Sequence, residues 1–259
     1  MVPCRRLVIP LRFRPFLLSV VCLLAFAPWV PSVAQQEAAI ISVVELFTSQ
    51  GCSVCPPADT LLKSYAERSN VIALSLPVDY WDYLGWKDTL ANPKFTGRQR
   101  AYAKARGDGE VYTPQVVVNG ASRVVGTKRG EIDQAIERTS KAFAAARVPM
   151  RVWTDNQTVT VDVGAATHPG ASSAGTVWFA VVQPRAEVEI RHGENRGRKL
   201  TYYNVVRDLT AVGMWSGQPT RIQLQHGAVV RSGNERCAVL LQQGAVGPIL
   251  GAAWMTPER

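Results

Sequence analysis

Apolar and polar positions divide the chain into two regions of different periodicity. Between residues 40 and 147, apolar runs typical of buried strands alternate with segments whose apolar residues recur every three or four positions, as in helices. The predicted elements are a strand at 40–47, a helix at 56–69, a strand at 71–78, a helix at 94–106, strands at 115–118 and 122–126, and a helix at 130–147. This order predicts an α/β fold that begins with a parallel βαβ unit.

Helical periodicity nearly vanishes after Pro149, where short runs of β-branched and aromatic residues are separated by turn signals. The strands predicted there lie at 150–154, 157–164, 175–183, 186–192, 198–209, 221–225 and 237–242. So many short strands predict a smaller antiparallel, β-rich and sandwich-like domain over residues 148–259.

The first 34 residues have the layout of a signal peptide. Four arginines and no acid precede an apolar run of about 15 residues, and small residues before Gln35 mark a cleavage site after Ala34. The run is shorter than the roughly 20 residues that span a bilayer, which favours a cleaved leader over a membrane anchor. We expect a periplasmic or secreted protein without a membrane span after cleavage.

Charge and cysteine content narrow the function classes. Without the leader, 25 basic and 20 acidic residues remain, and they form no clear stripe, which argues against nucleic acid as a partner. Three of the five cysteines also remain, namely Cys52, Cys55 and Cys237, which is too few for a disulfide framework. The Cys52 and Cys55 pair therefore calls for a chemical role or for one local bridge.

Cys52 and Cys55 lie where the first predicted strand leads into the first predicted helix. Free N–H groups and the positive dipole end at a helix N-terminus stabilise a thiolate, so we expect Cys52 to act as the nucleophile and Cys55 to resolve the mixed disulfide. Asp59 adds an acid to the first turn, where the dipole favours negative charge. A CxxC motif in this order of elements is the layout of a thioredoxin-like domain, which we place at residues 35–147.

Three further positions are candidates for the same chemistry. Thr113-Pro114 precedes a predicted strand, and in this layout such a bond is typically cis, so that Thr113 presents its backbone to a substrate chain. An ordinary loop proline is the alternative. Glu45 is an acid in an apolar strand; it could exchange a proton with Cys55 or be paired with a lysine or arginine.

An aromatic loop at residues 79–88 follows the second strand. Trp81 and Trp86 could anchor a partner there, or they could pack against the second domain. Cys237 opens an apolar strand and is expected to be an inert core thiol, with a cross-domain disulfide or a regulatory thiol as alternatives. His168, His192 and His226 do not have the spacing of metal ligands.

Four blocks carry a resemblance to a known family: VVELFTSQGCSVCPPAD, VDYWDYLGWKD, VYTPQVVVNG and GENRGRKLTYYNVVR. In this order they resemble the secreted bacterial family catalogued as domain of unknown function 1223, over nearly all of the mature chain. The resemblance implies a thioredoxin-like fold from about residue 40 to 147, with Cys52 and Cys55 as the dithiol and Pro114 as the cis-proline. Pro77 stands where members often have histidine, so no histidine can shuttle protons or bind metal there.

The predicted function is that of an exported thiol–disulfide oxidoreductase that needs no cofactor. Its partners would be protein thiols or disulfides, including those of a membrane or periplasmic redox protein. Two alternatives stay open: the dithiol could carry copper(I), which needs only two thiolates, or Cys52–Cys55 could be a structural bridge in a binding module.

Overall fold

The computed structural model describes residues 39–155, 157–167, 174–230 and 234–257. The predicted leader and His168 lie outside these residues. Residues Glu37–Arg259 form one compact unit. No helix of the described part of the chain is long and apolar enough to cross a membrane.

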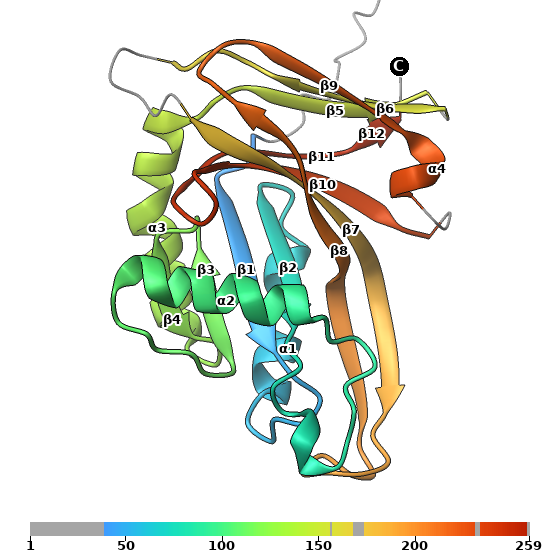
Figure 1. Ribbon diagram of the computed structural model, residues 1–259. Coiled ribbons are helices and arrows are strands. Elements are labelled where there is room, and N and C mark those ends of the chain that lie inside the picture. The colour runs from blue at the N-terminus through green and yellow to red at the C-terminus, as the bar shows by residue number, and fades with distance from the viewer. Residues whose placement is uncertain (1–38, 156, 168–173, 231–233, 258–259) are drawn as a thin grey trace, which may run out of the picture. The chain divides into compact units, whose positions relative to one another are not determined.

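The first region contains the alternating elements that the periodicity predicts (Figure 1). They are β1 (Ser42–Thr48), α1 (Pro56–Ala66), β2 (Val71–Pro77), α2 (Pro93–Arg106), β3 (Gln115–Val118), β4 (Ser122–Val125) and α3 (Arg129–Ala146). The aromatic loop also contains a short 3₁₀ helix, η1 (Asp82–Leu84), which was not predicted. β1 and β2 are parallel, β3 runs antiparallel to β1, and β4 completes the hairpin with β3.

The second region is mostly β-structure. It contains β5 (Met150–Thr154), β6 (Thr158–Val163), β7 (Gly175–Glu189), β8 (Lys199–Trp215), β9 (Thr220–Gln225), the short helix α4 (His226–Val229), β10 (Arg236–Gln243), β11 (Ile249–Trp254) and β12 (Thr256–Pro257). β11 and β12 were not predicted from the sequence.

The molecule is a mixed α/β protein with two sheets. An eight-stranded sheet has the order β11-β10-β7-β8-β2-β1-β3-β4, and a four-stranded sheet has the order β12-β5-β6-β9. The sequence predicted that the strands after residue 148 would associate with one another. They do so in two groups: β7, β8, β10 and β11 pair side by side and join the sheet of β1 and β2 through β8, whereas β5, β6, β9 and β12 form the second sheet.

β7 shows why the sequence suggested two strands at 175–183 and 186–192 where one long strand exists. Pro184 interrupts the apolar alternation and lacks the N–H group that a central strand needs. The pairing of β10 with β7 ends at Val182, so Pro184 faces an edge that has no further strand. A proline is tolerated there, and β7 continues to Glu189 beside β8.

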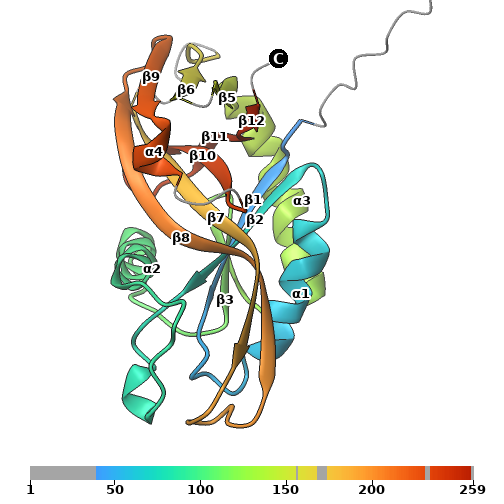
Figure 2. The same cartoon turned by 90° about the vertical axis from the view of Figure 1, so that its right-hand side faces the viewer.

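Helices cover both faces of the large sheet. α2 lies on one face, and α1 and α3 lie on the other (Figure 2). Alternate residues of β1 divide between the two faces: Val43 and Phe47 belong to the core under α2, whereas Val44 and Leu46 pack with α1. The side chains of Glu45 and of α1 therefore lie on opposite faces of the sheet.

A buried polar network fastens β1, α2 and β10 together. The Glu45 carboxylate accepts hydrogen bonds from Arg98 Nε at 2.7 Å and from the Tyr102 hydroxyl at 2.6 Å. Arg98 also donates to Gln242 of β10 at 3.0 Å. Burial works against the charged Arg98, but the Glu45 carboxylate outweighs it and raises the pKa of the guanidinium.

Replacing Arg98 with methionine should destabilise the protein by about 3–5 kcal/mol, because it leaves the buried Glu45 carboxylate without its cation. Urea denaturation measures the change. The matched control is Arg221→Met, which breaks the exposed Arg221–Asp162 pair and should cost about 1 kcal/mol or less. Equal losses in the two variants would contradict a structural role for the buried pair.

Candidate functional site

Cys52 and Cys55 form a disulfide at the junction of β1 and α1, with their Cα atoms 5.4 Å apart. Cys55 is the N-cap of α1, and its carbonyl oxygen accepts the backbone N–H groups of Ala58 and Asp59. The two residues between the cysteines are exposed, but Cys52 itself exposes only 1% of its surface. The N-terminus of α1 thus carries a covered disulfide.

The Thr113–Pro114 segment lies against Cys52. The carbonyl oxygen of Thr113 is 3.8 Å from Cys52 Sγ, and the bond to Pro114 is cis, the expected conformation. The Trp81 indole N–H donates to Thr113 Oγ1 at 2.7 Å. A Cβ on Gly51 would lie only 3.0 Å from the Trp81 Cβ, so glycine permits this close approach. Three segments distant in sequence meet at Cys52.

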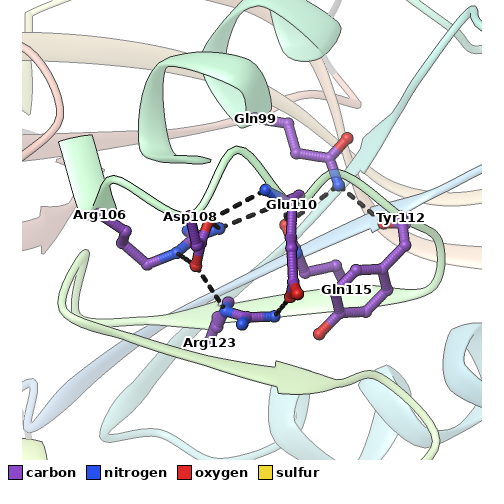
Figure 3. Close-up of polar contacts among 7 residues, drawn as sticks. All are labelled: Gln99, Arg106, Asp108, Glu110, Tyr112, Gln115 and Arg123. Atoms are coloured by element: carbon purple, nitrogen blue, oxygen red, sulfur yellow. Dashed lines mark hydrogen bonds and ion pairs between the residues drawn. The ribbon is translucent and has the colours of Figure 1, made fainter. Parts of the chain in front are cut away.

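Ion pairs secure the loop that leads to Thr113. They join four residues of α2, the loop and β4, namely Arg106, Asp108, Glu110 and Arg123 (Figure 3). Gln99 of α2 then donates to the Tyr112 carbonyl oxygen at 2.8 Å and to Gln115 at 3.1 Å (Figure 3). The position of Thr113 is therefore fixed from both sides of the loop.

Trp86 contacts another part of the Cys52 loop. Its indole N–H donates to Gln50 Oε1 at 2.8 Å, and its ring centre is 6.3 Å from that of His192. Both tryptophans predicted as anchors are partly buried, and each is hydrogen-bonded to a residue that contacts or adjoins the Cys52 loop. They shape the surroundings of the disulfide.

Glu45 is not beside the disulfide. Of the two alternatives left open by the sequence, the structure shows pairing with an arginine, because the carboxylate binds Arg98 on the α2 face. Cys55 begins α1, which packs on the opposite face.

Asp59 is a buried acid in the first turn of α1. We expected a charged side chain at the start of α1, but Asp59 is buried, and no described group completes a hydrogen bond with either carboxyl oxygen. Burial raises its pKa to about 8; the Thr48 hydroxyl lowers it in part, and nearby Asp88 raises it further. Asp59 follows Cys55 by four residues, so the two side chains lie on one face of α1. That spacing was the available signal.

Asp88, by contrast, has a structural role in holding the loop before Cys52. Burial raises its pKa to about 6, against the effect of the backbone N–H groups that bind it. Gln50, Leu90 and Ala91 donate those hydrogen bonds, the first at 2.7 Å. Asp88 is therefore mainly ionised at neutral pH, whereas Asp59 is mainly protonated.

The turn of the β7–β8 hairpin covers the loop that contains Cys52. The Asn195 side-chain amide donates to the carbonyl oxygens of Gln50 and Cys52, both at 2.9 Å. The Glu194 carboxylate accepts the Ser53 N–H at 3.3 Å. The sequence suggested only a packed hairpin here, because nothing local indicates which surface a hairpin turn will meet.

The other candidate residues lie apart from this chemistry. Cys237 is a free buried thiol in the core between the sheets, and burial followed by the Glu235 charge raises its pKa to about 12. His226 begins α4. The described residues contain no group of three or more histidine, cysteine or acidic side chains able to hold a metal ion.

The fold and the covered disulfide define a mixed α/β protein with one CxxC bridge, and comparison with known proteins identifies its family. The model of a family described as "Protein of unknown function (DUF1223)" matches residues 43–242, and the chain belongs to this family. No curated protein matches the chain.

Two solved structures resemble the chain. The crystal structure of protein AGR_C_4864 from Agrobacterium tumefaciens is 35% identical, with a TM-score of 0.73 over 84% of this chain and 95% of that one. HBP35 of Porphyromonas gingivalis is 13% identical, with a TM-score of 0.58 over 84% of this chain and 75% of that one. The second similarity is one of fold alone.

Asp59→Asn should stabilise the oxidised protein at pH 8 but not at pH 4. Below about pH 4 the carboxyl is protonated in both folded and unfolded chains; between there and pH 8 only the unfolded chain ionises, so the native state loses stability as pH rises. We expect a gain of a few kcal/mol at pH 8, by urea denaturation.

The control for that measurement is Glu131→Gln, which changes an exposed acid in the first turn of α3. Its effect should not increase between pH 4 and pH 8. A pH-independent effect of Asp59→Asn would mean that Asp59 is ionised in the folded protein.

Proposed function

We propose that this protein is an exported thiol–disulfide oxidoreductase with a thioredoxin-like arrangement of β1, α1, β2, α2, β3, β4 and α3. The observation that carries the proposal is the meeting of the Cys52–Cys55 disulfide, at a helix N-terminus, with the Thr113 backbone 3.8 Å from Cys52 Sγ. A bridge that serves only stability needs no such neighbour. A substrate chain beside Thr113 would bring its own sulfur to Cys52.

The exchange begins with attack by a partner thiolate on Cys52 Sγ. A bond forms between the partner sulfur and Cys52, and the Cys52–Cys55 bond breaks, so that Cys55 departs as a thiolate. A second partner thiolate then attacks the mixed disulfide and releases Cys52 as a thiolate. Two electrons pass to this protein, and the partner leaves with a disulfide; the same steps reversed oxidise this protein.

Asp59 supplies the proton that the buried Cys55 thiolate requires. Its carboxyl is protonated at neutral pH, since its pKa is about 8, and its side chain follows that of Cys55 by one helical turn. Transfer of this proton neutralises the departing sulfur inside the protein, where a charge is costly. Glu45 cannot take this role from the far face of the sheet while it is bound to Arg98.

The export that the leader indicates suits this chemistry, because disulfides persist in the periplasm and outside cells. A structural bridge is the competing function, and the covering of Cys52 is the observation that favours it. Reduction potential separates the two: exchange proteins lie at roughly −120 to −270 mV, and structural bridges lie below about −300 mV.

The first test equilibrates the mature protein with glutathione buffers and traps its free thiols. We expect a potential within the range of exchange proteins. Cys55→Ser should accumulate a mixed disulfide with glutathione at Cys52, and Cys52→Ser should form little, because Cys52 Sγ is the sulfur beside the Thr113 backbone, where a partner would bind. A potential below about −300 mV would sink the proposal.

The second test measures how fast glutathione reduces the disulfide, corrected for its thiolate fraction. Asp59→Asn should slow the reaction by about 10²-fold at pH 7, since asparagine cannot donate the proton. The wild-type rate should fall as pH rises through 8, while the variant rate stays level. Equal pH profiles for the two proteins would exclude Asp59 as the proton donor.

A further inference from the structure

Residues 190–198, the hairpin tip, form the turn that joins β7 to β8. It lies at the end of the large sheet where β1 leads into α1 (Figure 1). Ile190 and Leu200 at its base are buried in a small apolar cluster, with Trp86 packed against it. The turn is closed by two backbone hydrogen bonds: the Ile190 N–H donates to the Arg198 carbonyl oxygen, and the Gly197 N–H donates to the Ile190 carbonyl oxygen. The apolar cluster and the backbone hydrogen bonds fix the conformation of the hairpin tip at this end of the sheet.

Asn195 attaches the hairpin tip to the disulfide loop. The residue is only 1% exposed, and its two bonds to backbone carbonyl oxygens use both hydrogens of the side-chain amide. Arg198 donates to Asn195 Oδ1 at 2.8 Å, which leaves the amide nitrogen facing the loop. Every polar group of the Asn195 side chain is therefore used to hold this contact.

Glu194, the preceding residue, brings a negative charge to the motif itself. Its carboxylate accepts the N–H of Ser53, which lies between the two cysteines. N–H groups at this end of a helix otherwise stabilise an anionic sulfur. Glu194 both occupies one such donor and places a like charge beside the position of a Cys52 thiolate.

Other charged and titratable groups also surround this region. They include Arg191, His192, Arg196 and Arg198 within the tip, and Tyr202 on β8, which interacts electrostatically with Asp59, Asp88 and Arg198. Asp82 accepts the backbone N–H of Asp88. Asp88 is held by backbone N–H groups and Arg198 by Asn195. Among the charged groups of the described residues, Glu194 is the one hydrogen-bonded to the backbone between the cysteines.

We infer that the hairpin tip regulates the dithiol: Asn195 is a positioning residue that holds Glu194 at Ser53, and the Glu194 carboxylate disfavours the Cys52 thiolate. Because the thiolate belongs to the reduced form, this charge shifts the couple toward the disulfide. The biological role of this effect rests on the proposed function. The effect of Glu194 on the acidity of Cys52 does not depend on that function.

The test replaces Glu194 with glutamine, which keeps the acceptor oxygen and removes the charge. After reduction, the pH midpoint for iodoacetamide alkylation of Cys52 should move to lower pH. The equilibrium constant for oxidation by glutathione disulfide should fall about two- to fivefold, as for loss of an exposed charge interaction. Both differences should shrink in 1 M salt.

Glu189→Gln is the matched control, because Glu189 is an exposed acid on the same hairpin with no described hydrogen bond to the Cys52 loop. It should behave like the wild type. If Glu194→Gln also matched the wild type in both measurements, the inference would be overturned.

Asn195→Ala should shift both measurements in the same direction as Glu194→Gln, because the carboxylate is no longer held at Ser53. Adding Glu194→Gln to that variant should then change little. If the effects of the two substitutions on these measurements were fully additive, Asn195 would not be a positioning residue for Glu194. If Asn195→Ala does not fold, the Glu194→Gln variant alone decides the inference. A wild-type couple too reducing to exchange with glutathione would count against the oxidoreductase proposal, whereas the alkylation profile still tests Glu194.

Discussion

The pairing of β8 with β2 is the constraint on which the arrangement of the site depends. It joins the strands of the second region to the first sheet through Ser75 and Val205, and Asn204 reinforces it with a hydrogen bond to the Ala73 carbonyl oxygen at 3.0 Å. β7 and β8 extend past this junction as a long hairpin. Because β8 pairs with β2, the hairpin runs along the sheet toward the end of β1, and the turn of the hairpin contacts the loop around Cys52.

The two buried acids of the first region, Glu45 and Asp59, lie on opposite faces of the large sheet and differ in their charge state. Glu45 and Asp59 are both inaccessible to water, but Arg98 neutralises Glu45 within a network that reaches β10. Neither carboxyl oxygen of Asp59 has a hydrogen-bond partner in the described part of the chain, and burial raises its pKa to about 8, so that it is mainly protonated at neutral pH. One acid therefore stabilises the fold as an ion, and the other holds a proton near Cys55.

A buried disulfide can still exchange with a partner thiol when the segments that cover it are held by polar contacts. The Cys52 loop is held by hydrogen bonds from Asn195 and Trp86, and the Thr113 segment lies against it. Such contacts can be replaced by water or by a partner's backbone at modest net cost. The charge of Glu194 at the rim gives this cover an electrostatic influence on the dithiol that an apolar cover would lack.

Most local elements and the place of the disulfide can be read from the amino-acid sequence. Periodicity predicted β1 to α3, and the CxxC motif at a strand–helix junction predicted where the two cysteines would pair, because these signals depend on near neighbours. The partner of Glu45, the burial of Asp59 and the contact of Asn195 with the Cys52 loop follow instead from the folded arrangement of distant segments. Each depends on which face or sheet edge a distant segment occupies, and hydrophobic pattern alone does not encode strand order.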